Sequence, residues 1–459
     1  MRHPTTHSRV RPGFGAALGL CFGLCLGPFV GPRVAAANGR FPTAQHVVVG
    51  PGAGREALAL RTTFGVLTSL DGGRGWQWRC EEMLGYSYTA VWDPPVALGL
   101  SPAGPRLLVG LTDGLVGSPD GCTAAPVSAL SGRFAGDLTT SPDGRTVYFV
   151  SSDNRPNGLF VSRDGGETFA AYGATVEGVF FETVEVAPSD PLRLYLTGVT
   201  RAEPQRAVVY RSDDGGLTLR PLDWPGPPVE RLFVSGIDPR DPDVCYLRAT
   251  LPASTATALL RVTQAGAAVE EIARVDDAMR GFALSDDGRR VFVGSPEAGL
   301  MRSVDRGPFV PRGSYRVQCL RFHAGGLYVC GDERVDGFAL GRSEDDGATA
   351  LPLLRLGDVL PRPVCGPGST WSQRCEVLWP LLQSTLRPLR DGGPDTGPVG
   401  SLDAAGARDA PGGAPPPTGR GCGCRVVQGS PGGRPSVLGL GLLGALVRRR
   451  RVHRGPQVC

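Results

Sequence analysis

Five carboxylates are the residues of this chain whose type could support acid–base chemistry. They stand in or next to the connections between predicted strands, and they are Glu81, Glu82, Asp93, Glu182 and Glu185. Hydrolysis of a glycosidic bond would need two such groups about 5–10 Å apart, one acting as acid and the other as base or nucleophile. The alternative is that each carboxylate lies on the solvated surface. We therefore assign no catalytic residue from the sequence.

A second group of candidates lies in the longest connection, residues 82–95. Tyr86, Tyr88 and Trp92 could stack on a sugar or on a partner side chain, Asp93 could accept hydrogen bonds, and the prolines that follow stiffen the segment. In the alternative interpretation, the rings cover the space between two packed sheets. These four residues are the predicted ligand-binding candidates.

Twelve cysteines make disulfides a further expectation. Cys319 and Cys330 flank a predicted hairpin at equal distance from its turn, so they should pair across its two strands. The other predicted pairs are Cys365 with Cys375 and Cys80 with Cys122. Cys245 is left as a buried free thiol. There is no CxxC pair before residue 390, and the chain has only 5 histidines, so we expect no metal and no cofactor.

The elements that would position these residues are set by a repeat. Residues 162–169 read Ser-Arg-Asp-Gly-Gly-Glu-Thr-Phe, and the same phrase recurs at intervals of 40 to 51 residues, with a barely legible copy near Thr263. We call each copy a repeat turn. The residues that define the copies are Ser69, Asp71, Gly73 and Trp76; Ser118 and Asp120; Ser162, Asp164, Gly166 and Phe169; Ser212, Asp214 and Gly216; Ser303, Asp305 and Gly307; and Ser343, Asp345 and Gly347. The interval is typical of one propeller blade.

A second periodic feature alternates with the repeat turns. It consists of two apolar strands joined by a turn of Pro, Asp or Gly, as in residues 138–150. Together the two features give four strands per unit and seven units, or six if the copy near Thr263 is discarded. A single four-stranded sheet would leave both faces uncovered, whereas seven sheets around an axis cover one another. The sequence therefore predicts an all-β, seven-bladed β-propeller of four-stranded antiparallel blades over residues 38–356.

The repeat turns resemble the Asp-box, or BNR repeat, of sialidases, sortilin-type sorting receptors and a photosystem-assembly propeller family. The resemblance implies that the Asp caps a tight turn by accepting backbone N–H bonds, that Gly supplies a positive φ, and that the aromatic residue packs between blades. The Asp residues are then structural. Sialidases also carry an arginine triad, a Tyr–Glu pair and an early Phe-Arg-Ile-Pro motif. Residues 39–42 do not match that motif, and no catalytic set can be transferred.

The N-terminus resembles an export signal over residues 1–37. A positively charged start precedes the apolar stretch 14–30, and Ala35–Ala37 offers a small-residue cleavage site. The alternative is a lipoprotein signal that uses Cys21 or Cys25. Export places the chain in an oxidising compartment, where disulfides persist.

Two segments follow the predicted propeller. Residues 357–390 should form a small cap, closed by a disulfide and containing a helix after Cys375. Residues 391–420 are mainly Gly, Pro, Asp and Ala, a composition typical of a disordered linker without a core.

Residues 421–459 resemble the MYXO-CTERM sorting signal of myxobacterial surface proteins. Cys422 and Cys424 precede an apolar run at 436–447 and an arginine cluster at 448–451. The resemblance implies transient recognition at the inner membrane, processing near the cysteines and delivery to the cell surface. The apolar run is shorter than the about 20 residues that span a bilayer, so a non-functional tail is the alternative.

These observations favour an exported protein at the cell surface, in the outer membrane or outside the cell. We expect a monomeric, non-enzymatic binding or adhesion scaffold for a polysaccharide or a surface protein. A sialidase-like or other glycoside hydrolase is the first alternative, and an assembly or sorting factor for exported proteins is the second. The net charge of +4 is spread along the chain, so no nucleic-acid partner is expected.

Overall fold

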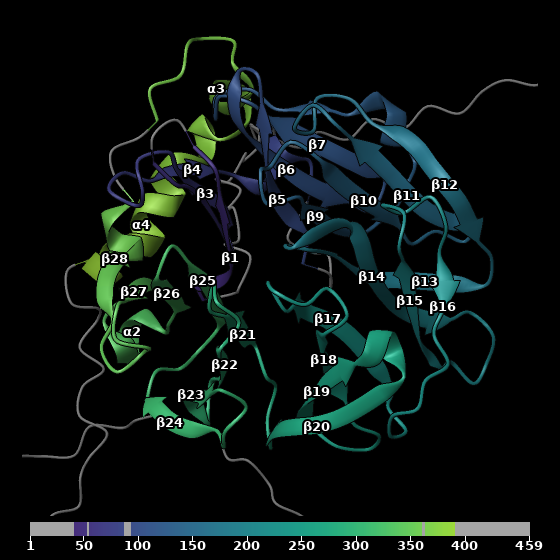
Figure 1. Cartoon of the computed structure of the whole chain (residues 1–459). Helices are drawn as coiled ribbons and strands as arrows, with labels where there is room; N and C mark the ends of the chain where they lie inside the picture. The colour runs from purple at the N-terminus through teal and green to yellow at the C-terminus, as the bar shows by residue number, and fades with distance from the viewer. Residues whose placement is uncertain (1–40, 53–54, 87–92, 360–362, 391–459) are drawn as a thin grey trace, which may run out of the picture. The chain divides into compact units, whose positions relative to one another are not determined.

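The computed structural model describes residues 41–52, 55–86, 93–359 and 363–390. Within them, 28 strands form seven four-stranded antiparallel sheets, each made of four strands that are consecutive in the chain. The sheets are arranged around an axis as the blades of a propeller (Figure 1). The predicted fold class is confirmed. The predicted export signal, linker and sorting tail, with Cys422 and Cys424, lie outside the described residues.

The strands of the blades have the following bounds. Blade 1 contains β1 (Ala44–Gly50), β2 (Ala57–Thr62), β3 (Gly65–Ser69) and β4 (Gln77–Arg79), and blade 2 contains β5 (Val96–Ser101), β6 (Gly104–Leu111), β7 (Gly114–Ser118) and β8 (Ala125–Pro126). Blade 3 contains β9 (Ala135–Thr140), β10 (Val147–Ser151), β11 (Asn157–Ser162) and β12 (Ala170–Val176), and blade 4 contains β13 (Val179–Ala187), β14 (Asp190–Thr200), β15 (Ala207–Ser212) and β16 (Arg220–Pro221). Blade 5 contains β17 (Arg231–Ile237), β18 (Cys245–Thr250), β19 (Thr257–Thr263) and β20 (Ala268–Val275), and blade 6 contains β21 (Gly281–Leu284), β22 (Arg290–Ser295), β23 (Gly299–Val304) and β24 (Val310–Gly313). Blade 7 contains β25 (Cys319–His323), β26 (Gly326–Cys330), β27 (Leu340–Ser343) and β28 (Leu351–Leu354).

The first strand of each blade lies innermost. These seven strands contact one another in sequence around the axis, and β25 of blade 7 returns to β1 of blade 1. Both faces of each sheet are covered by the neighbouring blades. Seven apolar clusters result, one at each junction between blades. This arrangement explains why the strands are rich in apolar residues and alternate weakly.

The repeat turns join the third and fourth strands of a blade. In blade 3, Asp164 Oδ1 accepts the N–H groups of Glu167 and Thr168, both at 2.9 Å, and the Ser162 hydroxyl at 2.6 Å. Gly165 and Gly166 have φ angles of 72° and 91°, which favour glycine. Phe169 is 7% exposed and packs in the cluster between blades 2 and 3. This turn therefore fixes blade 3 and seals its junction with blade 2.

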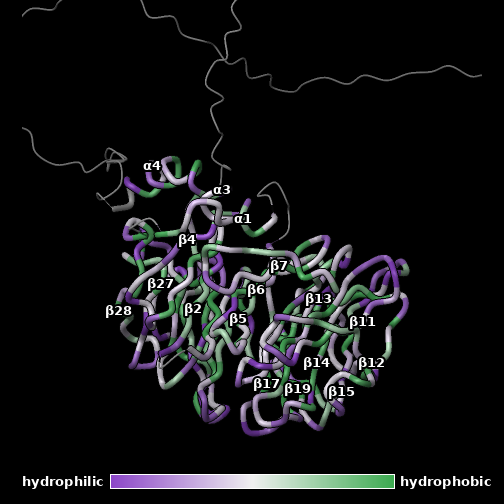
Figure 2. The backbone as a smooth tube through the Cα atoms, turned by 90° about the horizontal axis from the view of Figure 1, so that it is seen from above, coloured by the Kyte–Doolittle hydropathy of each residue, from purple (hydrophilic) through white to green (hydrophobic). Residues whose placement is uncertain are grey.

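The short helices have separate places in the chain. They are α1 (Glu81–Leu84), α2 (Glu333–Asp336), α3 (Thr370–Arg374) and α4 (Trp379–Arg390), with 3-10 turns at Ser128–Leu130, Gln264–Gly266, Leu356–Asp358 and Glu376–Leu378. Figure 2 shows α1, α3 and α4 together at one side of the blades. The longest helix of the described residues, α4, has 12 residues, and no helix there is long and apolar enough to cross a bilayer.

The cap is fastened by disulfides to blades that lie far away in the sequence. Cys80 bonds Cys375 and Cys122 bonds Cys365, each with a Cα–Cα distance of 5.5 Å. The predicted pairs Cys80–Cys122 and Cys365–Cys375 were therefore wrong. Spacing along the chain suggests only local partners, whereas here the cap lies against blades 1 and 2 and brings distant thiols within bonding distance.

The other two cysteine predictions concern blades 7 and 5. Cys319 and Cys330 face each other across β25 and β26 and are bonded, as the hairpin spacing predicts. Cys245 is buried as a free thiol. All three disulfides of the described residues lie in blades 1, 2 and 7 and the cap.

The cap also completes the junction between blades 7 and 1. Neither blade contributes a strand to the other, because each consists of four consecutive strands. Instead one apolar cluster contains residues of blade 7, blade 1 and the cap. Trp371 is 1% exposed, its indole N–H donates to Trp78 O at 3.0 Å, and its backbone N–H donates to Cys122 O at 3.0 Å. The ring is therefore closed by packing and by two disulfides.

Candidate functional site around the ring axis

Five ionisable residues gather near the ring axis, and we call them the axial cluster. Four are on inner strands and one is on a second strand: His46 on β1, Arg61 on β2, Asp137 on β9, Glu185 on β13 and Arg321 on β25. Each carboxylate or imidazole of the set has its pKa shifted by the charge of at least one other member, so the groups act on one another across several blades.

The two carboxyl groups of the cluster join blades 3 and 4. Asp137 Oδ2 accepts the backbone N–H of Val184 at 3.0 Å, and Glu185 Oε2 accepts the hydroxyl of Thr139 at 3.0 Å. Burial, and secondly the charge of Glu185, raise the pKa of Asp137 to about 8. Burial also raises the pKa of Glu185, opposed by Arg321 and by the bond from Thr139. Asp137 is therefore mainly protonated at neutral pH.

Blades 1 and 7 contribute the imidazole and the two guanidinium groups of the cluster. Burial, and then the charges of Arg61 and Arg321, lower the pKa of His46 to about 3, so the imidazole is neutral at neutral pH. The side chain of His46 is nevertheless reached by solvent, since it lies on an inner strand and is surrounded by protein without being covered. Near neutral pH the cluster therefore has two cationic groups and a single ionised carboxylate at most.

The two arginines of the cluster differ in their hydrogen-bond partners. Arg61 lies opposite His46 in the β1–β2 ladder and donates to Pro94 O at 2.8 Å, where the chain enters blade 2. Arg321 is exposed, and its guanidinium has no hydrogen bond or ion pair with any part of the chain that the structure describes. A guanidinium offers five donors in a planar fork that matches carboxylate, phosphate and sulfate groups. Arg321 is therefore the group of the cluster best placed to bind an anion.

Of the predicted ligand-binding residues, the structure describes only Tyr86 and Asp93. Tyr86 packs against the apolar cluster between blades 1 and 2; its buried hydroxyl has no partner among the described residues, and burial raises its pKa. Asp93 is exposed and accepts from Gln45 Nε2 at 3.4 Å. Tyr88 and Trp92 lie outside the described residues. For Tyr86 the structure favours the alternative interpretation, in which the ring covers a junction.

Only one of the five predicted carboxylates reaches the axial cluster. Glu81 is buried in α1, Glu82 is exposed, and Glu182 is paired with Arg231. Glu185 is the member that joins the cluster. The other members were missed, although aligning the inner strands on one another would have indicated three of them; Arg61 lies on a second strand and has no such signal. His46, Asp137 and Arg321 are each the third residue of their strand.

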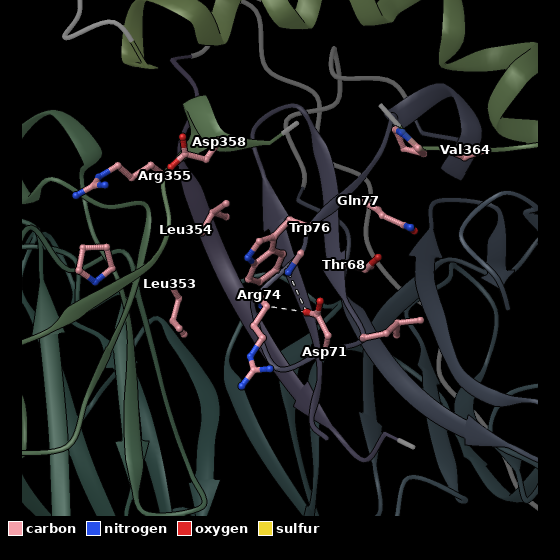
Figure 3. Close-up of a pocket in the computed structure, with 14 residues that line it drawn as sticks. Thr68, Asp71, Arg74, Trp76, Gln77, Leu353, Leu354, Arg355, Asp358 and Val364 are labelled. Carbon is pink, nitrogen blue, oxygen red and sulfur yellow. Dashed lines mark hydrogen bonds between the residues drawn. The ribbon is translucent and has the colours of Figure 1, made fainter. Parts of the chain in front are cut away.

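A hollow of about 660 Å³ lies elsewhere, between the outer strand β28 of blade 7 and the repeat turn of blade 1 (Figure 3). Asp71 Oδ1 is occupied there by the N–H groups of Arg74 and Gly75, both at 2.9 Å. Trp76 is 8% exposed and its indole N–H donates to Gly73 O at 3.0 Å. The carboxylate of Asp71 and the indole of Trp76 are thus used by the turn itself. We place the candidate site at the axial cluster instead.

The comparisons with known proteins concern the fold. No protein-family model and no curated protein sequence matches this chain. Among solved structures, hydrazine synthase of Kuenenia stuttgartiensis is 14% identical with a TM-score of 0.45, over 65% of this chain and 95% of that one. The GH74 enzyme of Niastella koreensis is 15% identical with a TM-score of 0.30, over 64% of this chain and 61% of that one.

A third similar structure is the extracellular domain of a one-component system of B. thetaiotaomicron. It is 12% identical with a TM-score of 0.41, over 65% of this chain and 38% of that one. The chain thus covers less than two thirds of the second and third of these proteins. At such identities and scores the three likenesses carry no argument about what this chain binds or catalyses.

Proposed function

We propose that this protein is an exported, surface-held β-propeller that binds an acidic polysaccharide at the axial cluster without cleaving it. The observation that carries the proposal is the exposed Arg321 guanidinium, which has no partner among the described residues and lies beside a neutral His46 and the second cation Arg61. Groups surrounded by protein are screened less than groups on an open surface, so a carboxylate bound there would interact strongly.

Three sets of features support the finer parts of this proposal. The disulfides fit an oxidising compartment. The resemblance of residues 1–37 to an export signal and of residues 421–459 to a MYXO-CTERM tail supports export and anchoring. The resemblance of the repeat turns to the Asp-box supports a rigid scaffold whose Asp residues hold the blades.

A glycoside hydrolase is the second candidate, and one observation favours it. Asp137 has a pKa raised to about 8 beside a second carboxyl group, Glu185, as expected of an acid and base pair. Against it, each of these groups accepts a hydrogen bond from the neighbouring blade, and this cross-blade role accounts for both residues without chemistry. We therefore rank binding above hydrolysis.

The test uses the purified chain with polygalacturonate, dextran sulfate and neutral dextran, measuring retained polysaccharide and released reducing ends in the same tubes. We expect retention of the acidic polymers only, without release. Arg321→Ala should weaken retention at least tenfold, the loss typical of a hydrogen-bonded charge. Arg220→Ala removes an exposed arginine of β16 and is the matched control.

The outcomes separate the candidates. Release of sugar that is abolished by Asp137→Asn or Glu185→Gln would replace the binding proposal with a hydrolase. Retention that is equal in Arg321→Ala and Arg220→Ala would remove the axial cluster as the site. If no polysaccharide is retained, the proposed ligand class is wrong and a protein partner takes its place.

A further inference from the structure

The repeat turn of blade 6 departs from the others, first at the residue that follows the Asp. The residue after the Asp has a positive φ in every copy: Gly72, Gly121, Gly165 and Gly215 have φ angles of 76°, 78°, 72° and 72°, and Asp346 has 60°. In blade 6 this residue is Arg306, with a φ of 64°. A long side chain in the left-handed region is disfavoured, whereas glycine adopts it freely. Such backbone outliers concentrate at functional sites, so Arg306 is a candidate functional residue.

Pro308 explains why this turn is built differently. In blades 1 and 3, the residue five positions after the Ser donates its N–H to the Asp carboxylate. Pro308 occupies that position in blade 6 and has no N–H. Asp305 instead forms a two-pronged ion pair with Arg289, with both N–O distances at 2.7 Å. The Asp of this turn is therefore directed to a side chain, and Arg306 stands where the other copies have no large side chain.

A cavity of about 350 Å³ lies beside this turn, between blades 5 and 6. Tyr246, Ile272, Val291 and Phe309 form its apolar part. Its ionisable lining residues are four carboxylates and four arginines, the latter being Arg240, Arg261, Arg289 and Arg306. Blade 5 also lacks an intact repeat turn, having a short 3-10 turn at Gln264–Gly266 in its place. The cavity thus lies where two consecutive blades lack the intact turn.

Three carboxylates of the cavity lining are paired with arginines. Glu270 is paired with Arg261, Glu271 with Arg274, and Asp305 with Arg289.

Two arginines remain for a ligand. Arg240 is held only loosely, with its Nε 3.8 Å from Asp238 Oδ1, and its side chain is 57% exposed. Arg306 is exposed and has no hydrogen bond or ion pair among the described residues. Both guanidinium groups act on the phenol of Tyr246, which places them around the same part of the cavity.

We propose that this cavity is a second ligand site, independent of the axial cluster, in which Arg306 and Arg240 bind a sulfate, phosphate or carboxylate group. Two guanidinium groups in a partly apolar cavity suit an oxyanion carried on a sugar ring, because the charge can meet the arginines while the ring contacts Phe309 and Ile272. The same oxyanion could also arrive as a free ion.

The test is a calorimetric titration of the whole chain at constant ionic strength with two probes. Inorganic sulfate represents the free ion, and a sulfated chondroitin disaccharide represents the sugar-borne group, with the unsulfated disaccharide as its control. Arg306→Gly is the decisive variant, because it restores the residue that four other repeat turns carry and so should fold at least as well as the parent chain. Arg206→Gly removes an exposed arginine from a different connection and is the matched control.

We expect saturable binding of the sulfated disaccharide, weaker binding of inorganic sulfate, and none of the unsulfated sugar. Arg306→Gly should lower the affinity at least tenfold, and Arg206→Gly and Arg321→Ala should leave it unchanged. Equal binding by Arg306→Gly and the parent chain would overturn the proposal, as would the absence of saturable binding by both sulfated probes. Equal affinities for the ion and the disaccharide would refute the sugar contact. A loss in Arg321→Ala would instead place the ligand at the ring axis.

Discussion

Removing the disulfide between Cys80 and Cys375 should destabilise the propeller by about 4 kcal/mol. With Cys122–Cys365 intact, the covalent loop that the bond closes runs from 80 to 122 and from 365 to 375, roughly 50 residues. The chain-entropy relation gives about 4 kcal/mol for a loop of that length. The variant is Cys80→Ser with Cys375→Ser, so that no unpaired thiol remains, and the observable is the free energy of unfolding in urea.

The two closing disulfides should also be coupled. Once Cys80–Cys375 has been removed, Cys122–Cys365 alone closes a loop of 243 residues along the chain. The same relation then gives more than 5 kcal/mol for the second bond, so the quadruple variant should lose over 1 kcal/mol more than the sum of the two double variants. Additive losses would show that one bond does not change the loop-closure entropy that the other removes from the unfolded chain.

The control is the disulfide inside blade 7. Cys319–Cys330 closes 11 residues, for which the relation gives about 3 kcal/mol. Its removal should leave the cap attached, whereas loss of both closing bonds should let a protease release the segment 363–390 under native conditions. A closing variant that loses less than 1 kcal/mol, or less than the blade 7 control, would refute the view that these bonds close the ring.

Three smaller predictions concern single side chains. Asp164→Ala should cost about 2 kcal/mol in urea unfolding, because its carboxylate accepts two backbone N–H groups, whereas Asp305→Ala should cost much less, since it loses only an exposed ion pair; equal costs would contradict the capping role. The folded pKa of Asp137, about 8, lies above its unfolded value, so stability should fall as pH rises from about 4 to about 8, and Asp137→Asn should flatten that decline in thermal unfolding. The folded pKa of His46, about 3, lies below its unfolded value, so stability should fall as pH drops from about 6.5 to about 3, and His46→Gln should flatten that limb; an unchanged slope would place the titration elsewhere.

The fold could be predicted because a local signal repeats. Each repeat turn carries its own turn chemistry, and its spacing gives the number of strands between copies, so seven blades follow from one short phrase read along the chain. The sequence even indicates that the turn of blade 6 is irregular, since Pro308 lacks the N–H that the Asp of an intact turn accepts. What the sequence could not indicate is the cavity that results beside it, which depends on how blades 5 and 6 pack.

The two cap disulfides and the axial cluster could not be predicted from the sequence, for the same physical reason. Cys375 finds Cys80 only because the cap docks on blade 1, a contact between residues 295 positions apart. The axial cluster likewise joins blades 1, 3, 4 and 7 through side chains that meet only when the ring closes. His46 looks uninformative as a lone histidine in the sequence, and its surroundings come from Arg61 on the next strand and Arg321 on the last blade.

The measurement that tests the central claim most directly is the affinity of the chain for polygalacturonate with and without Arg321. We predict saturable binding without release of reducing ends, weakened at least tenfold in Arg321→Ala and unchanged in Arg220→Ala, with the fold of both variants preserved in urea unfolding. Binding that is identical in the two variants, or polymer cleavage that requires Asp137, would contradict it.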